Sequence, residues 1–224
     1  MPRREFDRQL ETLREAVVEL GETVVDRLER AAEALETDDE SLAQSVIEGD
    51  AEVNDRYLDL EGDCIDLFAL QQPVAGDLRA VAAAYKISTD LERVGDLAVN
   101  VAEYALDLER ELSPEVPIEE LIGTAIRMVE DAVEAYAESG DAWRCHELAD
   151  RDTELDAMCA HAGEVITRTL LDHDVTDPEE IEGFVADATT LMLLVRDIER
   201  VGDHAVNVAA RTLYMTEGDD SLLE

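Results

Sequence analysis

Carboxylate side chains recur at a regular spacing in two nearly identical stretches of the chain. Residues 90–102 read DLERVGDLAVNVA and residues 197–209 read DIERVGDHAVNVA. Each stretch places Glu, Asp and Asn at steps of four, which brings the three side chains onto one face of a helix. Oxygen-only groups of this kind suit hard cations such as Mg, Mn, Ca or carboxylate-bridged iron. The candidate metal ligands in these stretches are Glu92, Asp96, Glu199 and Asp203, followed by Asn100 and Asn207.

A second pair of acidic segments precedes the two stretches. Residues 50–54 read DAEVN and residues 152–156 read DTELD, which adds Asp50, Asp152 and Asp156 as candidate ligands. Like charges four apart on a helix repel each other, so clustering them across two helices favours a cation between them. Asn54 stands where the second copy has Asp156, and we therefore expect tighter metal binding in the second half. A solvated acidic face is the alternative, because 57 of the 224 residues are acidic.

The apolar residues around the first stretch predict the helix that carries it. They alternate at steps of four and three, as on a helix that packs against other helices; the series is Ile87, Leu91, Val94, Ala98, Val101, Ala105 and Leu108. Gly95 and Gly202 fall in the middle of their helices, where glycine costs about 1 kcal/mol relative to alanine. We expect a neighbouring helix to approach closely there, or a bound ion to need the room.

The repeated stretches indicate an internal duplication, because Glu92 and Glu199 lie 107 residues apart in a chain of 224. The sequence predicts an all-α fold of six long helices in two tandem three-helix bundles of the spectrin-like kind. Proline and capping signals divide the chain into these helices. The expected helices are 5–35, 37–71 (with Thr37 and Glu40 as a capping box), 74–112, 118–138, 141–171 and 178–215. The prolines at 114 and 117 place the boundary between residues 1–113 and 114–224.

Composition narrows the class of protein further. The formal net charge is −39, and Lys86 is the only lysine, as expected for the surface of a protein from a high-salt (halophilic) cytoplasm. We do not expect this protein to bind nucleic acid, because binding requires basic side chains that neutralise phosphates. The first seventeen residues show no apolar run, so we expect neither a signal peptide nor a membrane-spanning helix, and a cytoplasmic location. The three cysteines lack metal-binding spacing and are expected as buried hydrophobic residues.

The two E-R-V-G-D-x-A-x-N stretches resemble those of the PhoU family of phosphate-uptake regulators, and residues 72–79, QPVAGDLR, are similar to that family's Q-P-x-A-x-D-L-R. The resemblance covers nearly the whole chain as two tandem repeats. It implies multinuclear iron or zinc clusters on the carboxylates, while the oxygen-only donor set leaves magnesium or manganese as alternatives. It also implies negative control of a phosphate ABC transporter by contact with its ATPase subunit, and contact with a membrane sensor kinase.

Three functions remain open from the residues. The first is a regulator that is not an enzyme, has no catalytic residues and acts by binding partners. A second copy of the chain, in a homodimer, is one of these expected partners. A carboxylate-bridged metalloenzyme is the second, although the E-x-x-H ligands of di-iron bundles are missing. The third is a metal-free helical adaptor of another phosphate permease.

Overall fold

The computed structural model describes residues 3–71, 75–108, 116–138, 142–172 and 177–223. Its helices are α1 (Arg3–Thr37), α2 (Glu40–Glu48), α3 (Asp50–Gln71), α4 (Ala75–Asp107), α5 (Ile118–Ala137), α6 (Ala142–Asp172) and α7 (Pro178–Glu217). No strand occurs within these ranges. The predicted all-α fold is confirmed.

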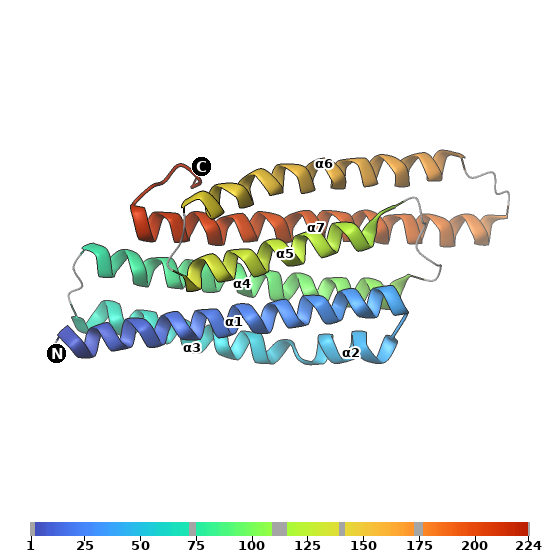
Figure 1. The fold of residues 1–224 in the computed structure, drawn as a ribbon. Helices are drawn as coiled ribbons and strands as arrows, with labels where there is room; N and C mark the ends of the chain where they lie inside the picture. The colour runs from blue at the N-terminus through green and yellow to red at the C-terminus, as the bar shows by residue number, and fades with distance from the viewer. Residues whose placement is uncertain (1–2, 72–74, 109–115, 139–141, 173–176, 224) are drawn as a thin grey trace.

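The expected second helix is interrupted, which corrects the sequence prediction. The helix α2 ends at Glu48 and α3 begins at Asp50, so Gly49 separates two helices that follow one another along the same line (Figure 1). The reason is a side chain from α1: Nη2 of Arg27 donates a 2.7 Å hydrogen bond to the carbonyl oxygen of Val46 in the last turn of α2. A Cβ added to Gly49 would lie 2.8 Å from Nη1 of the same side chain. Glycine at this position leaves room for a buried guanidinium, and the α-helix stops on either side of it.

The predicted start of the last helix at residue 178 is confirmed, whereas the predicted capping box is wrong. Asp177 caps α7 by accepting a 3.0 Å hydrogen bond from the Glu179 backbone N–H, with Pro178 in the first turn. The predicted capping box of Thr37 and Glu40 is wrong, because α1 extends to Thr37 and Asp39 accepts the 3.0 Å bond from Leu42 N–H. The proline turn at 72–73 and the boundary between residues 113 and 114 lie outside the described residues.

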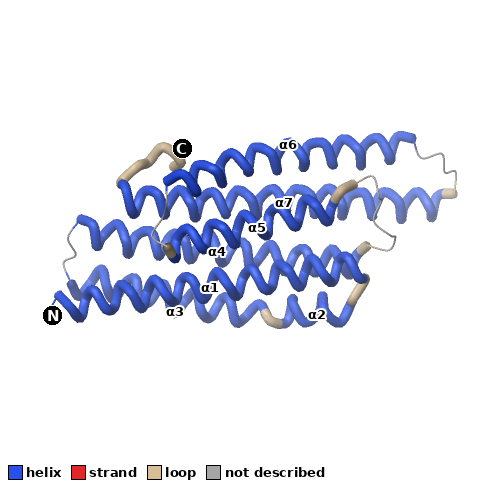
Figure 2. The backbone as a smooth tube through the Cα atoms, in the orientation of Figure 1, coloured by secondary structure: helices blue, strands red, loops and turns tan. Residues whose placement is uncertain are grey.

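The two halves of the chain lie side by side along their length (Figure 2). The first half contributes α1 to α4 and the second half α5 to α7. The helices α4 and α7 pack against each other and α1 packs against α5, while α2, α3 and α6 lie on the outside. Buried apolar side chains from both halves belong to one continuous core. The repeated stretches of α4 and α7 therefore lie against each other at the junction between the repeats.

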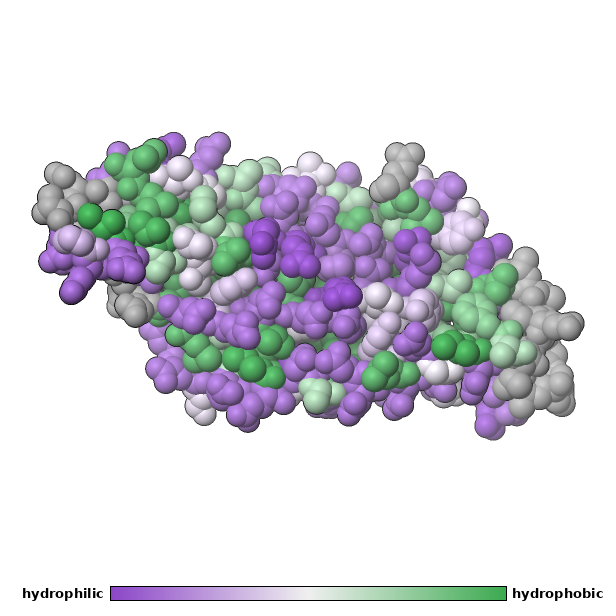
Figure 3. Space-filling model, turned by 180° about the vertical axis from the view of Figure 1, so that it is seen from behind, coloured by the Kyte–Doolittle hydropathy of each residue, from purple (hydrophilic) through white to green (hydrophobic). Residues whose placement is uncertain are grey.

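Charged side chains occupy the surface that this core leaves exposed. Figure 3 shows hydrophilic residues along the middle of one face, with apolar patches towards its ends. Cys64, Cys145 and Cys159 are buried, as predicted. None of the helices in the described part of the chain is both long and apolar enough to cross a membrane.

Candidate functional site

The carboxylates predicted for the second repeat lie near one another between α6 and α7. Asp152 and Asp156 extend from α6, and Glu199 and Asp203 from α7. Burial, together with the charges of the other three carboxylates, raises the pKa of Asp152 to about 6. Burial, followed by the charges of Asp156 and Asp203, also raises the pKa of Glu199. The two helices thus bring four like charges close enough to destabilise one another.

This cluster has no positive partner in the described part of the chain. Oδ1 of Asp152 is buried without any hydrogen bond. An unpaired buried oxygen of this kind costs roughly 1–3 kcal/mol. Gly202 allows the close approach, because a Cβ at this position would lie 2.8 Å from Oδ1 of Asp152 and 2.7 Å from Cδ2 of Leu155. The sequence prediction of a close contact at this glycine is confirmed.

The equivalent acids of the first repeat are paired with basic and amide groups instead. Asp50 Oδ1 lies 3.6 Å from Nη2 of Arg27, and its Oδ2 accepts a 2.8 Å hydrogen bond from Asn54. Arg93 lies 3.2 Å from an oxygen of Asp96 and 3.5 Å from an oxygen of Glu92. Burial and the charge of Asp96 raise the pKa of Glu92, and Arg93 opposes this shift. The first cluster is therefore partly neutralised within the protein.

The two candidate asparagines connect the repeats. Asn100 on α4 donates a 3.0 Å hydrogen bond to Asp197 on α7, and Asn207 on α7 donates a 3.2 Å bond to Asp90 on α4. Asp90 also lies 2.9 Å from Nδ1 of His204. The aspartate that begins each repeated stretch thus accepts from the asparagine ten positions along the other stretch. The amide nitrogens of both asparagines are used in this contact, and only their oxygens remain for a ligand.

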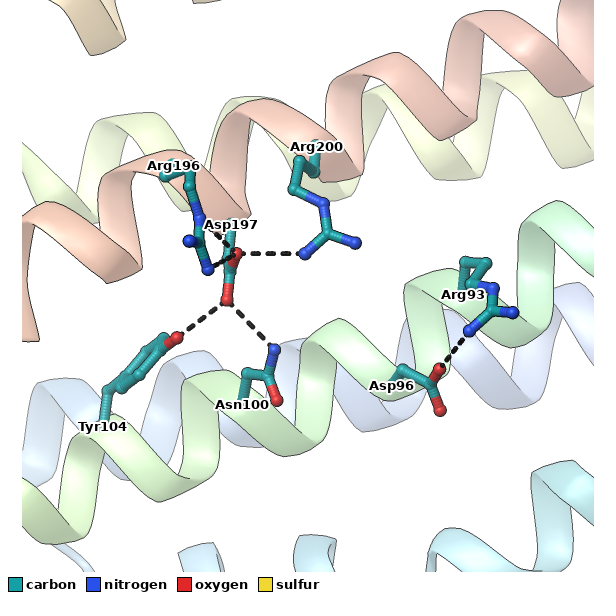
Figure 4. Close-up of polar contacts among 7 residues, drawn as sticks. All are labelled: Arg93, Asp96, Asn100, Tyr104, Arg196, Asp197 and Arg200. Carbon is teal, nitrogen blue, oxygen red and sulfur yellow. Dashed lines mark hydrogen bonds and ion pairs between the residues drawn. The ribbon is translucent and has the colours of Figure 1, made fainter.

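Asp197 is the most buried charge at this junction, with 0% of its surface exposed. It accepts hydrogen bonds from Tyr104 at 2.8 Å and from Arg196 at 2.9 Å, and Arg200 donates to it at 3.2 Å (Figure 4). Burial alone would raise the pKa of Asp197, but the hydrogen bonds from Tyr104, Arg196 and Asn100 outweigh burial and lower it. Asp197 is therefore an ionised, fully paired carboxylate that holds α7 to α4.

Sequence reasoning did not assign Asp90, Asp197, Tyr104 or Arg27 to the site. For the two aspartates a signal was available, since both begin the repeated stretch and keep their identity in both copies. Arg93 and Arg200, which occupy the same position in the two repeated stretches, each pair with an acid of their own helix. The two arginines pair with acids at different positions of the stretch. Arg93 pairs within the first carboxylate cluster, whereas Arg200 pairs with Asp197, outside the second cluster.

The donor atoms of the two carboxylate clusters differ in how well they fit a bound metal ion. Among the described His, Cys, Asp and Glu side chains, no three converge as a group ready to hold a metal ion. In the second repeat, the unpaired buried oxygen of Asp152 and the all-oxygen donor set fit a hard cation, because a cation would satisfy that oxygen and relieve the repulsion. In the first repeat, Arg27 and Asn54 engage both oxygens of Asp50. Arg93 already places a positive charge beside one oxygen each of Glu92 and Asp96, so the residues do not fit a cation as they stand.

These features define an internally duplicated helical-bundle protein with a carboxylate cluster in each half. The family model described as "PhoU domain" matches the chain twice, over residues 17–105 and 118–212. The chain belongs to the PhoU domain family.

Relatives support the same assignment over almost the full length. A phosphate-specific transport system accessory protein PhoU homolog from Aquifex aeolicus is 35% identical, over 95% of this chain and 93% of the relative. A PhoU homolog 1 of the same description from Methanothermobacter thermautotrophicus is 32% identical, over 96% and 95%. The crystal structure of PhoU from Pseudomonas aeruginosa superposes with a TM-score of 0.86 at 30% identity, covering 96% of this chain and 100% of that one.

Proposed function

We propose that this protein is an accessory regulator of phosphate transport, which restrains a phosphate ABC transporter by contact with its ATPase subunit when phosphate is plentiful. The family match over both repeats is the observation that carries the proposal, together with relatives whose names describe accessory proteins of a phosphate-specific transport system. A membrane sensor kinase is a second expected partner.

The carboxylates of the second repeat would make this restraint sensitive to bound metal. Asp152, Asp156, Glu199 and Asp203 would hold the cation, which would supply positive charge where four carboxylates now repel one another. A bound divalent or trivalent ion would cancel much of the local negative charge, and the potential of a surface affects which partner docks on it. Iron or zinc is the expected metal, with magnesium or manganese as alternatives.

Labelled-phosphate uptake tests the regulatory role. A strain without the protein should keep importing phosphate after transfer to phosphate-rich medium, whereas the parent strain should slow its uptake several-fold. The wild-type gene should restore the restraint. The double change Glu199→Gln with Asp203→Asn should restore it poorly, provided that immunoblots show equal amounts of protein. Uptake that is the same in the parent and deletion strains, under both rich and starved conditions, would contradict the proposal.

A double substitution at the surface, which removes the same amount of charge, serves as the matched control for the carboxylate variant. Glu179→Gln with Glu182→Gln removes two negative charges from the exposed first turns of the same helix, away from the cluster. This variant should restore the restraint as well as the wild-type gene does. If it failed equally, lost surface charge would explain the effect instead of lost ligands.

A further inference from the structure

A buried arginine lies against the carboxylate cluster of the first repeat. Arg27 belongs to α1, and only 5% of its surface is exposed. Its Nη2 donates a 2.7 Å hydrogen bond to the carbonyl oxygen of Val46, in the last turn of α2. The same nitrogen lies 3.6 Å from Oδ1 of Asp50, the first residue of α3. A charge this deeply buried needs such partners, because burial of an unpaired ion is strongly unfavourable.

The backbone around Arg27 accommodates this side chain. The break between α2 and α3 falls at Gly49, where any Cβ would come within 2.8 Å of the guanidinium. Asn54 completes the arrangement by donating to the second oxygen of Asp50. Both oxygens of Asp50 are thus engaged, one by a cationic group and the other by an amide.

The second repeat has no arginine in this role among its described residues. The only arginine of α5 is Arg127, which donates to Thr124 on its own helix. Arg151 on α6 directs its guanidinium to Asp131 and Glu147. Arg200 on α7 turns to Asp197. The buried oxygen of Asp152, at the position that Asp50 holds in the first repeat, is left without a partner.

We propose that Arg27 takes, in the first repeat, the place that a metal ion takes in the second, and so closes the first repeat to metal. The inference rests on the proposed metal binding of the second repeat. A cation that entered the first cluster would have to separate Asp50 from Arg27. That would leave a buried guanidinium without its carboxylate, while Arg93 would repel the ion from the side of Glu92 and Asp96.

Counting bound Mn²⁺ tests this directly. Metal-stripped wild-type protein and the variant Arg27→Met would be titrated with Mn²⁺ in the same KCl buffer, with free Mn²⁺ followed by electron paramagnetic resonance. The variant should bind at least one Mn²⁺ more per chain than the wild type, and adding Asp50→Asn to the variant should abolish the extra binding. An unchanged number of bound ions in a folded Arg27→Met variant would overturn the proposal.

Two milder changes keep the test valid if Arg27→Met does not fold. Asp50→Asn should leave the Mn²⁺ content of the wild type unchanged, whereas Asp152→Asn should lower the affinity for Mn²⁺ at least tenfold. Equal losses in the two variants would show that the first repeat holds metal and would overturn the proposal. Wild-type protein that binds no Mn²⁺ would instead contradict the metal role in the proposed function, and a gain of binding in Arg27→Met would still support closure by Arg27.

Discussion

Asn100 in the first repeat and Asp197 in the second share a 3.0 Å hydrogen bond at the centre of the junction between the repeats. The reciprocal contact, from Asn207 to Asp90, lies on the same pair of helices. Because the two contacts use the same positions of the duplicated stretch, each repeat supplies one donor and one acceptor to the other. The duplicated residues therefore stabilise the pairing of the repeats as well as presenting carboxylates.

The burial of these two contacts predicts unequal losses of stability. Asn100→Ala removes a donor from an aspartate with no exposed surface, and hydrogen bonds to charged groups contribute about 1.5–3 kcal/mol. Asn207→Ala removes a longer bond from an exposed asparagine, for which we expect less than about 1 kcal/mol. Urea unfolding of both variants in the same KCl buffer would measure the difference. Equal midpoints would show that Asp197 gains little from Asn100.

Gly202 should tolerate alanine poorly although it lies inside a helix. Alanine gains roughly 1 kcal/mol of helix propensity over glycine, but its Cβ would lie 2.7 Å from a carbon of Leu155, which has no exposed surface. Overpacking a core costs typically 1–3 kcal/mol, so we expect a net loss of about 1 kcal/mol in thermal or urea unfolding.

Gly163 on α6 is the matched control for that substitution. No atom lies within 4 Å of the Cβ that alanine would add there. Gly163→Ala should therefore raise the free energy of unfolding by up to about 1 kcal/mol. The close contact between α6 and α7 would be refuted if both alanine variants were stabilised.

Apart from the break at Gly49, the sequence alone predicted the helices, the duplication and the faces that carry the acids, because these depend on periodicities of three, four and 107 residues. A close approach of a neighbouring helix at Gly202 was one of the two expectations for this residue, the other being room for a bound ion. The spacing of three residues between Arg93 and Asp96 likewise allows their ion pair within one turn of the helix. The spacing of residues along the sequence is sufficient to predict all of these features.

Contacts between distant helices could not be predicted in the same way. Arg27 lies on a long amphipathic helix, and periodicity does not show which arginine at the edge of an apolar face reaches inward. The break at Gly49 follows from that side chain and from no local signal stronger than a single glycine. Similarly, the spacing of Asn100 predicts its face but not that Asp197, 97 residues away, lies opposite.

The net charge predicts a dependence of the fold on salt. At −39 the protein repels itself, and this repulsion grows as the Debye length increases from about 3 Å at 1 M salt to about 10 Å at 0.1 M. Helicity and the thermal midpoint should therefore fall below a few tenths molar KCl, as measured by far-UV circular dichroism. A parallel series at constant osmolality, made up with sorbitol, controls for effects of water activity. Unchanged helicity and midpoint in dilute buffer would refute the prediction.

Asp152 predicts a pH dependence of stability in the metal-free protein. Its pKa is raised from 3.8 to about 6 in the folded state, so between these values the folded protein binds more protons than the unfolded chain. Stability should therefore fall as pH rises from about 4 to about 6 and remain lower at neutral pH. Since one pKa unit corresponds to about 1.4 kcal/mol, and solvent screens a partly exposed group, we expect this group to contribute a loss of about 1–2 kcal/mol.

The substitution Asp152→Asn isolates the contribution of Asp152 to the pH dependence of stability from those of the other acids. Asp152→Asn should stabilise the chelator-treated protein at pH 7 and have little effect at pH 4, because the wild-type side chain is largely protonated there. Asp50→Asn is the matched control in the first repeat, and it should destabilise the protein at pH 7, since it removes the carboxylate paired with buried Arg27. Urea unfolding at the two pH values would measure both variants. The change in the free energy of unfolding at pH 7 should have opposite signs in the two variants, because the same position carries an unpaired charge in one repeat and a paired charge in the other. A loss of stability in both variants would mean that Asp152 has a partner in solution.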